Sequence, residues 1–365
     1  MKKLISSILF IVITASLSLL LLTSCQSPYK PVASTDEESR VMMTLSVSEN
    51  EYAVKYELYR ALFIALRASV DGGDLAVWSG PGKDDYIEKI DALILERAAE
   101  IYSVFEECRA AGINLYSADV DKTVNQYIAA SVEGGYIGDY RIEGAGSYEK
   151  YLENLRAAGL NYSVQDLIYR YTIGLILLDN HYKGDINKGT LGSIKYTRED
   201  VKAFYDGDSS VRIIRPFFDA MYFEKSRVSE IRSVAAALGT EKEFASFVID
   251  YTTVGGSDIK NGLVIGRYSL NSLVYSELVD TAFNLSIGKV SPVITISGTA
   301  EDGYCFFYRA EKSEKHFSDC YDSIVDAYLE NEIGRRLSDN AAALTASAVK
   351  TAELHALDRS AITVD

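Results

Sequence analysis

The fold is decided between residues 261 and 308, where the chain reads NGLVIGRYSLNSLVYSELVDTAFNLSIGKVSPVITISGTAEDGYCFFY. The pattern predicts a short strand over 262–268, bounded by glycines, and a helix over 278–285. A tight turn then leads to two strands, over 293–297 and 304–308. Short strands around one helix are typical of a small α+β domain.

The residues just upstream complete this domain. Branched and aromatic residues predict strands over 211–214 and 217–223, because such side chains suit a pleated surface. Apolar residues at helical spacing predict helices over 228–238 and 241–248. The expected order is therefore β-α-α-β-α-β-β, and we assign residues 207–312 to this domain.

Helices dominate the rest of the chain. Helical spacing runs through most of residues 45–206 and returns over 313–348, whereas 349–365 shows no clear pattern. Capping boxes mark three expected helix starts: Ser48 with Glu51, Ser163 with Asp166, and Thr197 with Asp200. The fold class is α+β, with a helical domain, the small domain, a returning C-terminal helix and a tail.

The composition excludes several kinds of function. Lys and Arg number 37 against 52 Asp and Glu, which gives a formal charge of −15. A nucleic-acid binder needs a basic face, so we expect no nucleic-acid partner. The chain has three histidines and no spacing of ligands typical of a metal site, so no metal and no cofactor are expected.

The amino terminus has the pattern of a secretion signal. Lys2 and Lys3 precede an uncharged apolar run from Leu4 to Leu22. This run ends in Leu22-Thr23-Ser24-Cys25, which resembles the bacterial lipobox. We expect a signal peptide over 1–24, a lipidated Cys25, and a polar tether over 25–44. The chain would then be extracytoplasmic and lipid-anchored to a bacterial membrane; a plain transmembrane anchor is the alternative.

The whole arrangement resembles the extracytoplasmic foldases of the SurA/PrsA type, which carry a parvulin-type (PpiC) peptidyl-prolyl isomerase domain on a helical chaperone domain. Three stretches carry the resemblance. Residues 45–52 (LSVSENEY) look like a short strand running into a capped helix, and 148–182 and 197–206 look like later parts of the helical domain. The most specific stretch is the series NGLVIGRY, LVDTAF, LSIGKVSPV and GY between 261 and 304.

The resemblance also implies site residues, and here the chain departs from the family. Two histidines and an acid or thiol typically support the twisted prolyl amide. Met221 and Cys305 occupy the positions of the two histidines, and Val254 occupies that of the acid or thiol. The apolar proline pocket is better preserved, since Val274, Leu278 and Phe283 match its lining. Ordinary core packing is the alternative for these three. Substitute polar groups could come from Asp219, Asp250 or Tyr251, and a disulfide between Cys305 and Cys320 is left open.

Three functions follow from these observations. The first is a folding factor, a chaperone or foldase that binds unfolded or nascent secreted proteins and segments containing X-Pro, without the catalytic histidines. The second is an active peptidyl-prolyl cis-trans isomerase. The third is a binding or structural lipoprotein that shares only the fold, since a fold does not fix function.

Overall fold

The computed structural model describes residues 29–137, 140–184, 192–251, 261–270, 276–296 and 303–362. These residues form two compact units. The helical unit comprises residues 29–178 and 337–362, and the inserted unit comprises residues 179–336. Helices α6 (Tyr162–Lys183) and α13 (Tyr321–Ala346) each contribute residues to both units. The α+β class expected from the sequence is confirmed.

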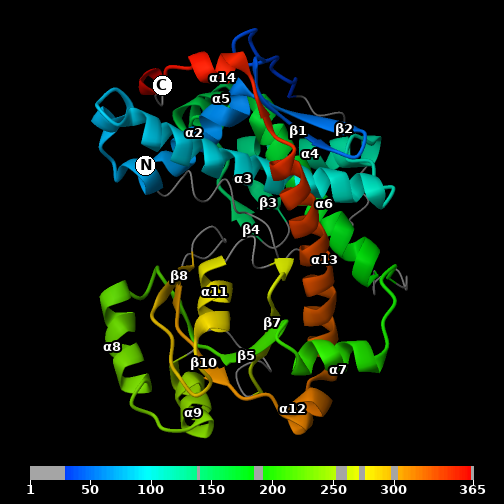
Figure 1. Ribbon diagram of the computed structural model, residues 1–365, viewed down its shortest axis with the longest axis vertical. Coiled ribbons are helices and arrows are strands. Elements are labelled where there is room, and N and C mark those ends of the chain that lie inside the picture. Colours follow the sequence, from blue (N-terminus) through cyan, green and yellow to red (C-terminus); the bar gives the residue numbers. More distant parts are fainter. Residues whose placement is uncertain are drawn as a thin grey trace. The chain divides into compact units, whose positions relative to one another are not determined.

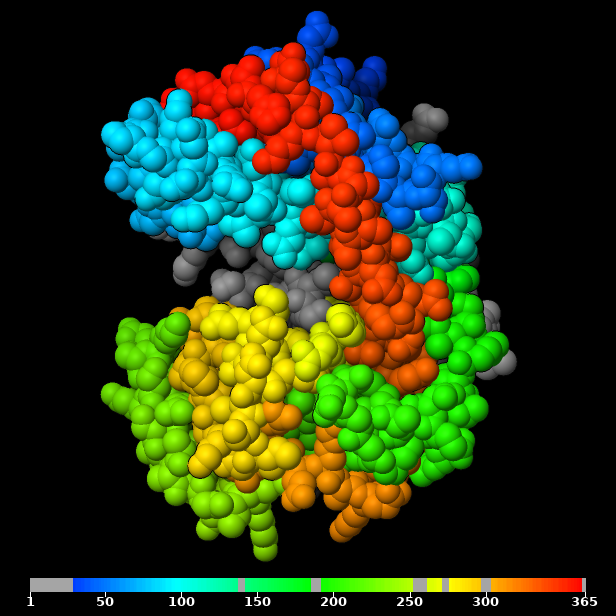
Figure 2. All heavy atoms as spheres, in the orientation of Figure 1, coloured from blue at the N-terminus to red at the C-terminus, as the bar shows by residue number. Residues whose placement is uncertain are grey.

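The helical unit is built from both ends of the described chain (Figure 1). Besides parts of α6 and α13, its elements are β1 (Val41–Val47), β2 (Asn50–Lys55), α2 (Tyr56–Asp71), η1 (Leu75–Trp78), α3 (Lys83–Ala110), α4 (Ala118–Glu133), β3 (Gly135–Ile137), β4 (Tyr140–Ile142), α5 (Tyr148–Ala157), β11 (Val349–Lys350), α14 (Ala352–Ala356) and η4 (Arg359–Ala361). A three-stranded antiparallel sheet in the order β11-β1-β2 joins the two ends. Figure 2 shows the red C-terminal residues lying against the blue N-terminal ones.

The start of this unit differs from the expectation. Ser48 does not cap a helix with Glu51; it has a φ of 54° and lies in the turn of the β1–β2 hairpin. Helix α2 begins only at Tyr56. A Ser-x-x-Glu sequence suits either a cap or a polar turn, and pairing of Thr44 with the distant Val349 favours the strand.

The segment expected to be a tether is not free over its described part. Its last residues, from Val41, belong to β1, and Ser34 shares a hydrogen bond of 2.8 Å with Ser163.

Ser163 is not the cap of α6, because the helix already begins at Tyr162. Asn161 takes that role, since its Oδ1 accepts the Val164 backbone N–H at 2.9 Å.

The inserted unit contains α7 (Arg198–Asp206), β5 (Ser210–Ile214), β6 (Phe217–Asp219), α8 (Lys225–Ala235), α9 (Glu241–Tyr251), β7 (Leu263–Gly266), α11 (Ser276–Asn284), β8 (Ile294–Ile296), β9 (Gly303–Cys305), β10 (Tyr308–Ala310) and α12 (Glu314–Asp319). Thr197 and Asp200 form the expected capping box at α7. The C-terminal helix expected over 313–348 is divided into α12 and α13, and residues beyond it form β11, α14 and η4.

The described strands of the inserted unit form two three-stranded antiparallel sheets. Strand β5 pairs with β7 and β10, whereas β6 pairs with β9, which also pairs with β8. Pro216 separates β5 from β6, and proline cannot donate to a ladder. The strand orders are therefore β10-β5-β7 in one three-stranded sheet and β6-β9-β8 in the other.

Helix α13 passes very close to the turn after β7. A Cβ on Gly334 would lie 1.3 Å from the Tyr268 carbonyl oxygen. One turn earlier, Asn331 Oδ1 accepts the Tyr268 backbone N–H at 3.0 Å. Glycine at position 334 thus lets the helix hold the end of β7 through direct backbone approach.

Candidate functional site

The sheet of the inserted unit has two differently covered faces. Side chains alternate along each strand, so Cys305 and Phe307 lie on one face and Phe306 and Tyr308 on the other. Helix α11 packs on the Cys305 face, and α8 and α9 pack on the opposite face (Figure 1). The residues that the sequence singled out therefore do not all meet.

Cys305 is at the centre of the face under α11. Its exposed fraction is 0%, and it packs with Leu278, Ile294 and Phe307. Burial raises the pKa of its thiol to about 11, although the Arg215 charge acts in the opposite direction. A thiol of this kind is protonated at neutral pH and is not a nucleophile.

Met221 does not meet Cys305, so the expected register is wrong. Strand β6 pairs with β9 through Phe217↔Cys305 and ends at Asp219↔Gly303. Met221 lies beyond this ladder in an exposed turn, with an exposed fraction of 80%. Two groups that support one amide must lie side by side. The cross-strand neighbours of Cys305 are the apolar Phe217 and Ile294, and the polar side chain that reaches its thiol is Arg215.

Asp219 has a local role at this turn. Its Oδ1 accepts the Met221 backbone N–H at 2.7 Å, which is an Asx-turn that stabilises the chain reversal after β6. Asp250 and Tyr251 lie at the end of α9, on the opposite side of the sheet from Cys305. Tyr251 stacks on Phe247 with ring centroids 4.5 Å apart. These three residues do not supply a polar group to Cys305.

The described residues expected to line a proline pocket lie on α11. Leu278 is 4% exposed and belongs to the core under the helix, while Phe283 is partly buried against that core. The Arg267 guanidinium lies 4.5 Å from the Phe283 ring centroid. Arg309 donates to the Phe283 carbonyl oxygen at 2.9 Å and so holds the end of α11. Val254 and Val274 lie outside the described residues, and the pocket stays a prediction.

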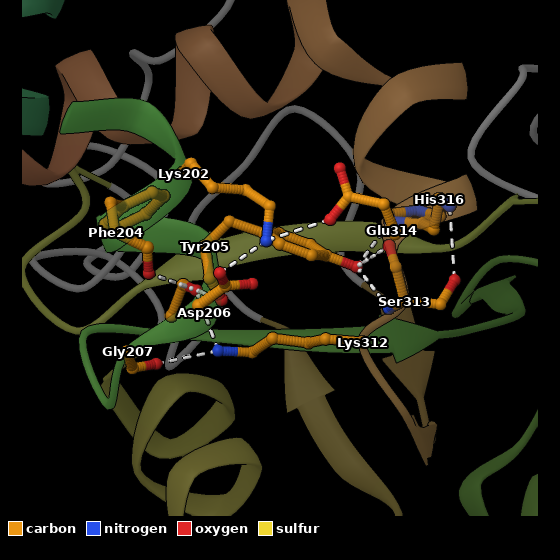
Figure 3. A network of polar contacts seen from close by, with 10 residues as sticks. Lys202, Phe204, Tyr205, Asp206, Gly207, Lys312, Ser313, Glu314 and His316 are labelled. Atoms are coloured by element: carbon orange, nitrogen blue, oxygen red, sulfur yellow. Dashed lines mark hydrogen bonds and ion pairs between the residues drawn. The ribbon is translucent and has the colours of Figure 1, made fainter. Parts of the chain in front are cut away.

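A cluster of polar side chains lies where the chain enters the sheet after α7 and where it leaves the sheet before α12 (Figure 3). It joins the end of α7 to the start of α12. The Ser313 backbone N–H donates to Tyr205 Oη at 2.9 Å, and the same hydroxyl is 3.0 Å from His316 Nδ1. Lys312 Nζ donates to the Gly207 carbonyl oxygen at 2.7 Å. Lys202 forms ion pairs with Asp206 and with Glu314, the latter at 3.1 Å.

Burial controls the protonation of this cluster. It lowers the pKa of His316 to about 4 and that of Lys312 to about 8. His316 is neutral at pH 7 and only 6% exposed, although Glu314 and Lys315 precede it in the sequence. Ser313 caps α12, because its side chain accepts the His316 backbone N–H. This cap places His316 in the first turn of the helix. The contacts described for this cluster join the end of α7 to the start of α12.

Other chemistry finds little support in the described chain. Cys108, Cys305 and Cys320 are not joined in disulfides, so the disulfide left open between the last two is not formed. Among the described residues, His, Cys, Asp and Glu do not gather into a group of three or more that could hold a metal ion. Within the same residues, every helix is too short or too polar to cross a membrane. Cys25 lies outside the described residues.

Comparisons with known proteins found few similar chains. No family model and no curated protein matches this chain. Among solved structures it is similar to foldase protein PrsA from Streptococcus pneumoniae, with 16% identity, a TM-score of 0.24, and coverage of 83% of this chain and 92% of that one. It is also similar to PrsA from Bacillus subtilis, with 13% identity, a TM-score of 0.24, and coverage of 85% and 93%. These TM-scores are too low to establish a shared overall fold.

Proposed function

We propose that this chain is a lipid-anchored extracytoplasmic folding factor that binds unfolded or extended segments of secreted proteins. The observation that carries the proposal is the arrangement of the chain. The described elements of the α+β unit follow the order β5-β6-α8-α9-β7-α11-β8-β9-β10, and the unit is inserted in the sequence between α6 and α13 of a helical unit. A helical part, a small α+β domain and a returning helix are the organisation implied by the sequence resemblance to SurA/PrsA-type foldases with a parvulin-type domain.

The same unit supports binding rather than catalysis. Enzymatic support of a twisted amide needs polar groups that reach the substrate. Here Cys305 is fully buried and its cross-strand neighbours are the apolar Phe217 and Ile294. The histidines of the chain are His181, His316 and His355, and none lies on a strand of this sheet. We therefore propose a parvulin-like domain that lacks isomerase activity.

Exposed apolar side chains offer contacts for a client. Among the described residues of the inserted unit, the apolar side chains with the highest exposed fractions are Met221, Tyr222, Val234, Ile249 and Ile287. Met221 and Tyr222 are adjacent in the turn after β6, with exposed fractions of 80% and 74%. Extended client segments bind to such surfaces by burying alternate apolar side chains. A methionine adapts to varied partners because its side chain is unbranched and flexible.

Two assays on residues 26–365 test the proposal. In the first, a chemically unfolded client is diluted into buffer with and without the protein, and aggregation is followed by light scattering. We expect suppression at near-stoichiometric amounts, weakened by Met221→Ser with Tyr222→Ser and unchanged by the control Leu75→Ser. In the second, a protease-free assay follows cis-trans exchange of X-Pro peptides, and the uncatalysed rate is expected. Acceleration would favour an active isomerase, and failure of both assays would favour a lipoprotein that shares only the fold.

Lipidation is tested separately. Cells producing the full chain are labelled with radioactive palmitate, and the Cys25→Ala variant is the control. Label on the parent protein that disappears in the variant is the expected result. Label on both proteins, or on neither, would contradict the anchor.

A further inference from the structure

We infer that the helical unit rests on the bilayer surface, with the patch formed by Tyr29, Lys30, Glu133 and Tyr148 nearest to the lipid headgroups. We call these residues the Tyr29 patch. The inference rests on the proposed lipidation of Cys25 and adds a fixed orientation of this unit to it. Its basis is that the chain is attached to the folded unit only four residues after that cysteine.

Tyr29 is held on the surface of the helical unit by two other elements. Its hydroxyl donates to Glu133 Oε1 at the end of α4, and this hydrogen bond raises the Tyr29 pKa. Its ring lies 5.1 Å, centroid to centroid, from that of Tyr148 at the start of α5. The Tyr148 hydroxyl in turn donates to the Lys30 carbonyl oxygen at 2.5 Å. The Tyr29 side chain is thus held by a hydrogen bond and by ring packing, and the Lys30 backbone is held by a second hydrogen bond.

The residues that follow are attached as well. Ser34 contacts Ser163 on α6 at 2.8 Å and also donates to Glu57 on α2. Asn161 Nδ2 donates to Glu38 Oε1 at 3.0 Å, and the Tyr56 backbone N–H donates to the Arg40 carbonyl oxygen at 2.7 Å. The path from Tyr29 to β1 therefore adds no free length between the lipid and the unit.

The remaining chain is short. Four Cα–Cα steps separate Cys25 from Tyr29, so their Cα atoms can be at most about 14 Å apart. The acyl chains on a lipidated cysteine place that residue at the membrane surface. Each headgroup layer is itself about 5–8 Å thick. The Tyr29 patch must then lie within or directly above the headgroups, whatever path the intervening residues take.

The chemistry of the patch suits this position. Tyrosine combines an apolar ring with a polar hydroxyl and is favoured at membrane–water interfaces. The Tyr148 ring packs on Tyr29 at the surface, and on its other side on Tyr151, which is only 5% exposed and belongs to the core beneath the patch. Tyr136, three residues after Glu133, is 70% exposed on β3. The exposed Lys30 adds a positive charge, which anionic headgroups attract.

Fluorescence quenching by headgroups tests the inference on the full lipidated chain in vesicles of phosphatidylglycerol and phosphatidylethanolamine. The fluorophore is attached to a cysteine replacing Lys150 on α5, in a Cys320→Ser background, because Cys108 and Cys305 are buried. A second protein carries the label in place of Lys83, at the start of α3. We expect nitroxide-labelled headgroups to quench the first label strongly and the second weakly.

Two changes should abolish this difference. Twenty Gly/Ser residues inserted between Pro28 and Tyr29 add a flexible reach of about 25 Å and should release the unit. The double variant Tyr29→Ala with Tyr148→Ala should detach the patch and reduce quenching at position 150, whereas the matched control Tyr116→Ala should not. Equal quenching at the two sites, or quenching at 150 that survives the insertion, would overturn the inference. A chain that fails to float with vesicles would overturn the lipid anchor and the inference with it.

Discussion

Arg359 and Asp91, which lie 268 positions apart in the sequence, form a buried ion pair in the helical unit. Arg359 Nη2 lies 3.1 and 3.0 Å from the two carboxylate oxygens of Asp91. Tyr59 Oη donates to the same carboxylate at 2.6 Å, and Lys350 Nζ is 3.1 Å away. The last described residues are thus an integral part of the unit that contains the first ones, rather than a loose tail.

Removing one partner should destabilise the helical unit strongly. For Arg359→Met we expect a loss of about 3–5 kcal/mol in the free energy of unfolding, because Asp91 would remain as a buried charge short of its main partner. The measurement is urea unfolding of residues 26–365. The control is Arg40→Met, which breaks exposed ion pairs with Glu37 and Glu353 and should cost less than about 1 kcal/mol. Equal losses in both variants would contradict the role of burial.

Glycine at position 334 should be required for the inserted unit. In Gly334→Ala the new methyl group would overlap the Tyr268 carbonyl oxygen, so α13 must move away from the end of β7. We expect a loss of about 3 kcal/mol, at the upper end for overpacking. The control is Gly239→Ala, where a Cβ would meet only Glu243 Oε2 at 3.8 Å. Thermal unfolding of the two variants compares them directly, and an unshifted Tm for Gly334→Ala would refute the close approach.

His316 should make stability depend on pH below neutrality. Its pKa is lowered to about 4 in the folded chain, whereas an unfolded histidine titrates near 6.5. Between these values the unfolded state binds a proton that the folded state excludes, so stability falls as pH falls from about 6.5 to 4. The Arg212 charge acts in the same direction as burial and lowers the His316 pKa, whereas hydrogen bonds with the backbone of Gly262 and Asn261 and the charge of Asp319 act in the opposite direction.

The variant His316→Phe keeps a ring beside Tyr205 and removes the titrating group. We expect it to flatten the decline in unfolding free energy between pH 6.5 and 4 by about 2–3 kcal/mol. The exposed His355 on α14 provides the control, because His355→Asn should leave the slope unchanged. A slope that is the same in all three proteins would show that His316 is not the buried group responsible.

The three thiols should differ in reactivity. Burial raises the pKa of Cys108 to about 12 and that of Cys305 to about 11, whereas Cys320 is partly exposed. In native residues 26–365, a disulfide reagent at pH 8 should therefore modify Cys320 and spare the other two until urea is added. Mass spectrometry of digested samples identifies the modified residues. Rapid modification of native Cys305 would mean that the face under α11 is open to solvent.

Much of the inserted unit could be predicted from the sequence because its signals are local. Thr197 and Asp200 form the expected capping box, and the strands expected over 211–214 and 262–268 are found as β5 and β7. The register of Met221 could not be predicted, since the strand break at Pro216 and the turn at Asp219 depend on pairing with β9. The amino-acid composition of a strand stays the same when its register shifts by a few residues, so composition cannot predict the register.

The ends of the chain show the opposite case. Ser48 and Glu51 match a capping box locally, yet β1 pairs with β11 from the far end of the chain and the segment becomes a hairpin. Ser163 also matches a cap, but Asn161, two residues earlier, is better placed to accept the Val164 N–H. The charged residues around His316 in the sequence do not indicate its burial, which comes from the packing of α12 against Tyr205.

Light scattering of an unfolded client is the measurement that tests the central claim most directly. A chemically denatured, proline-containing secreted protein is diluted into buffer with residues 26–365 at increasing ratios. The account predicts that scattering falls in proportion to the added protein until the two are near equimolar, and that the Met221→Ser, Tyr222→Ser variant suppresses it less well. Scattering that is unchanged at every ratio, for several clients, would contradict a role in protein folding.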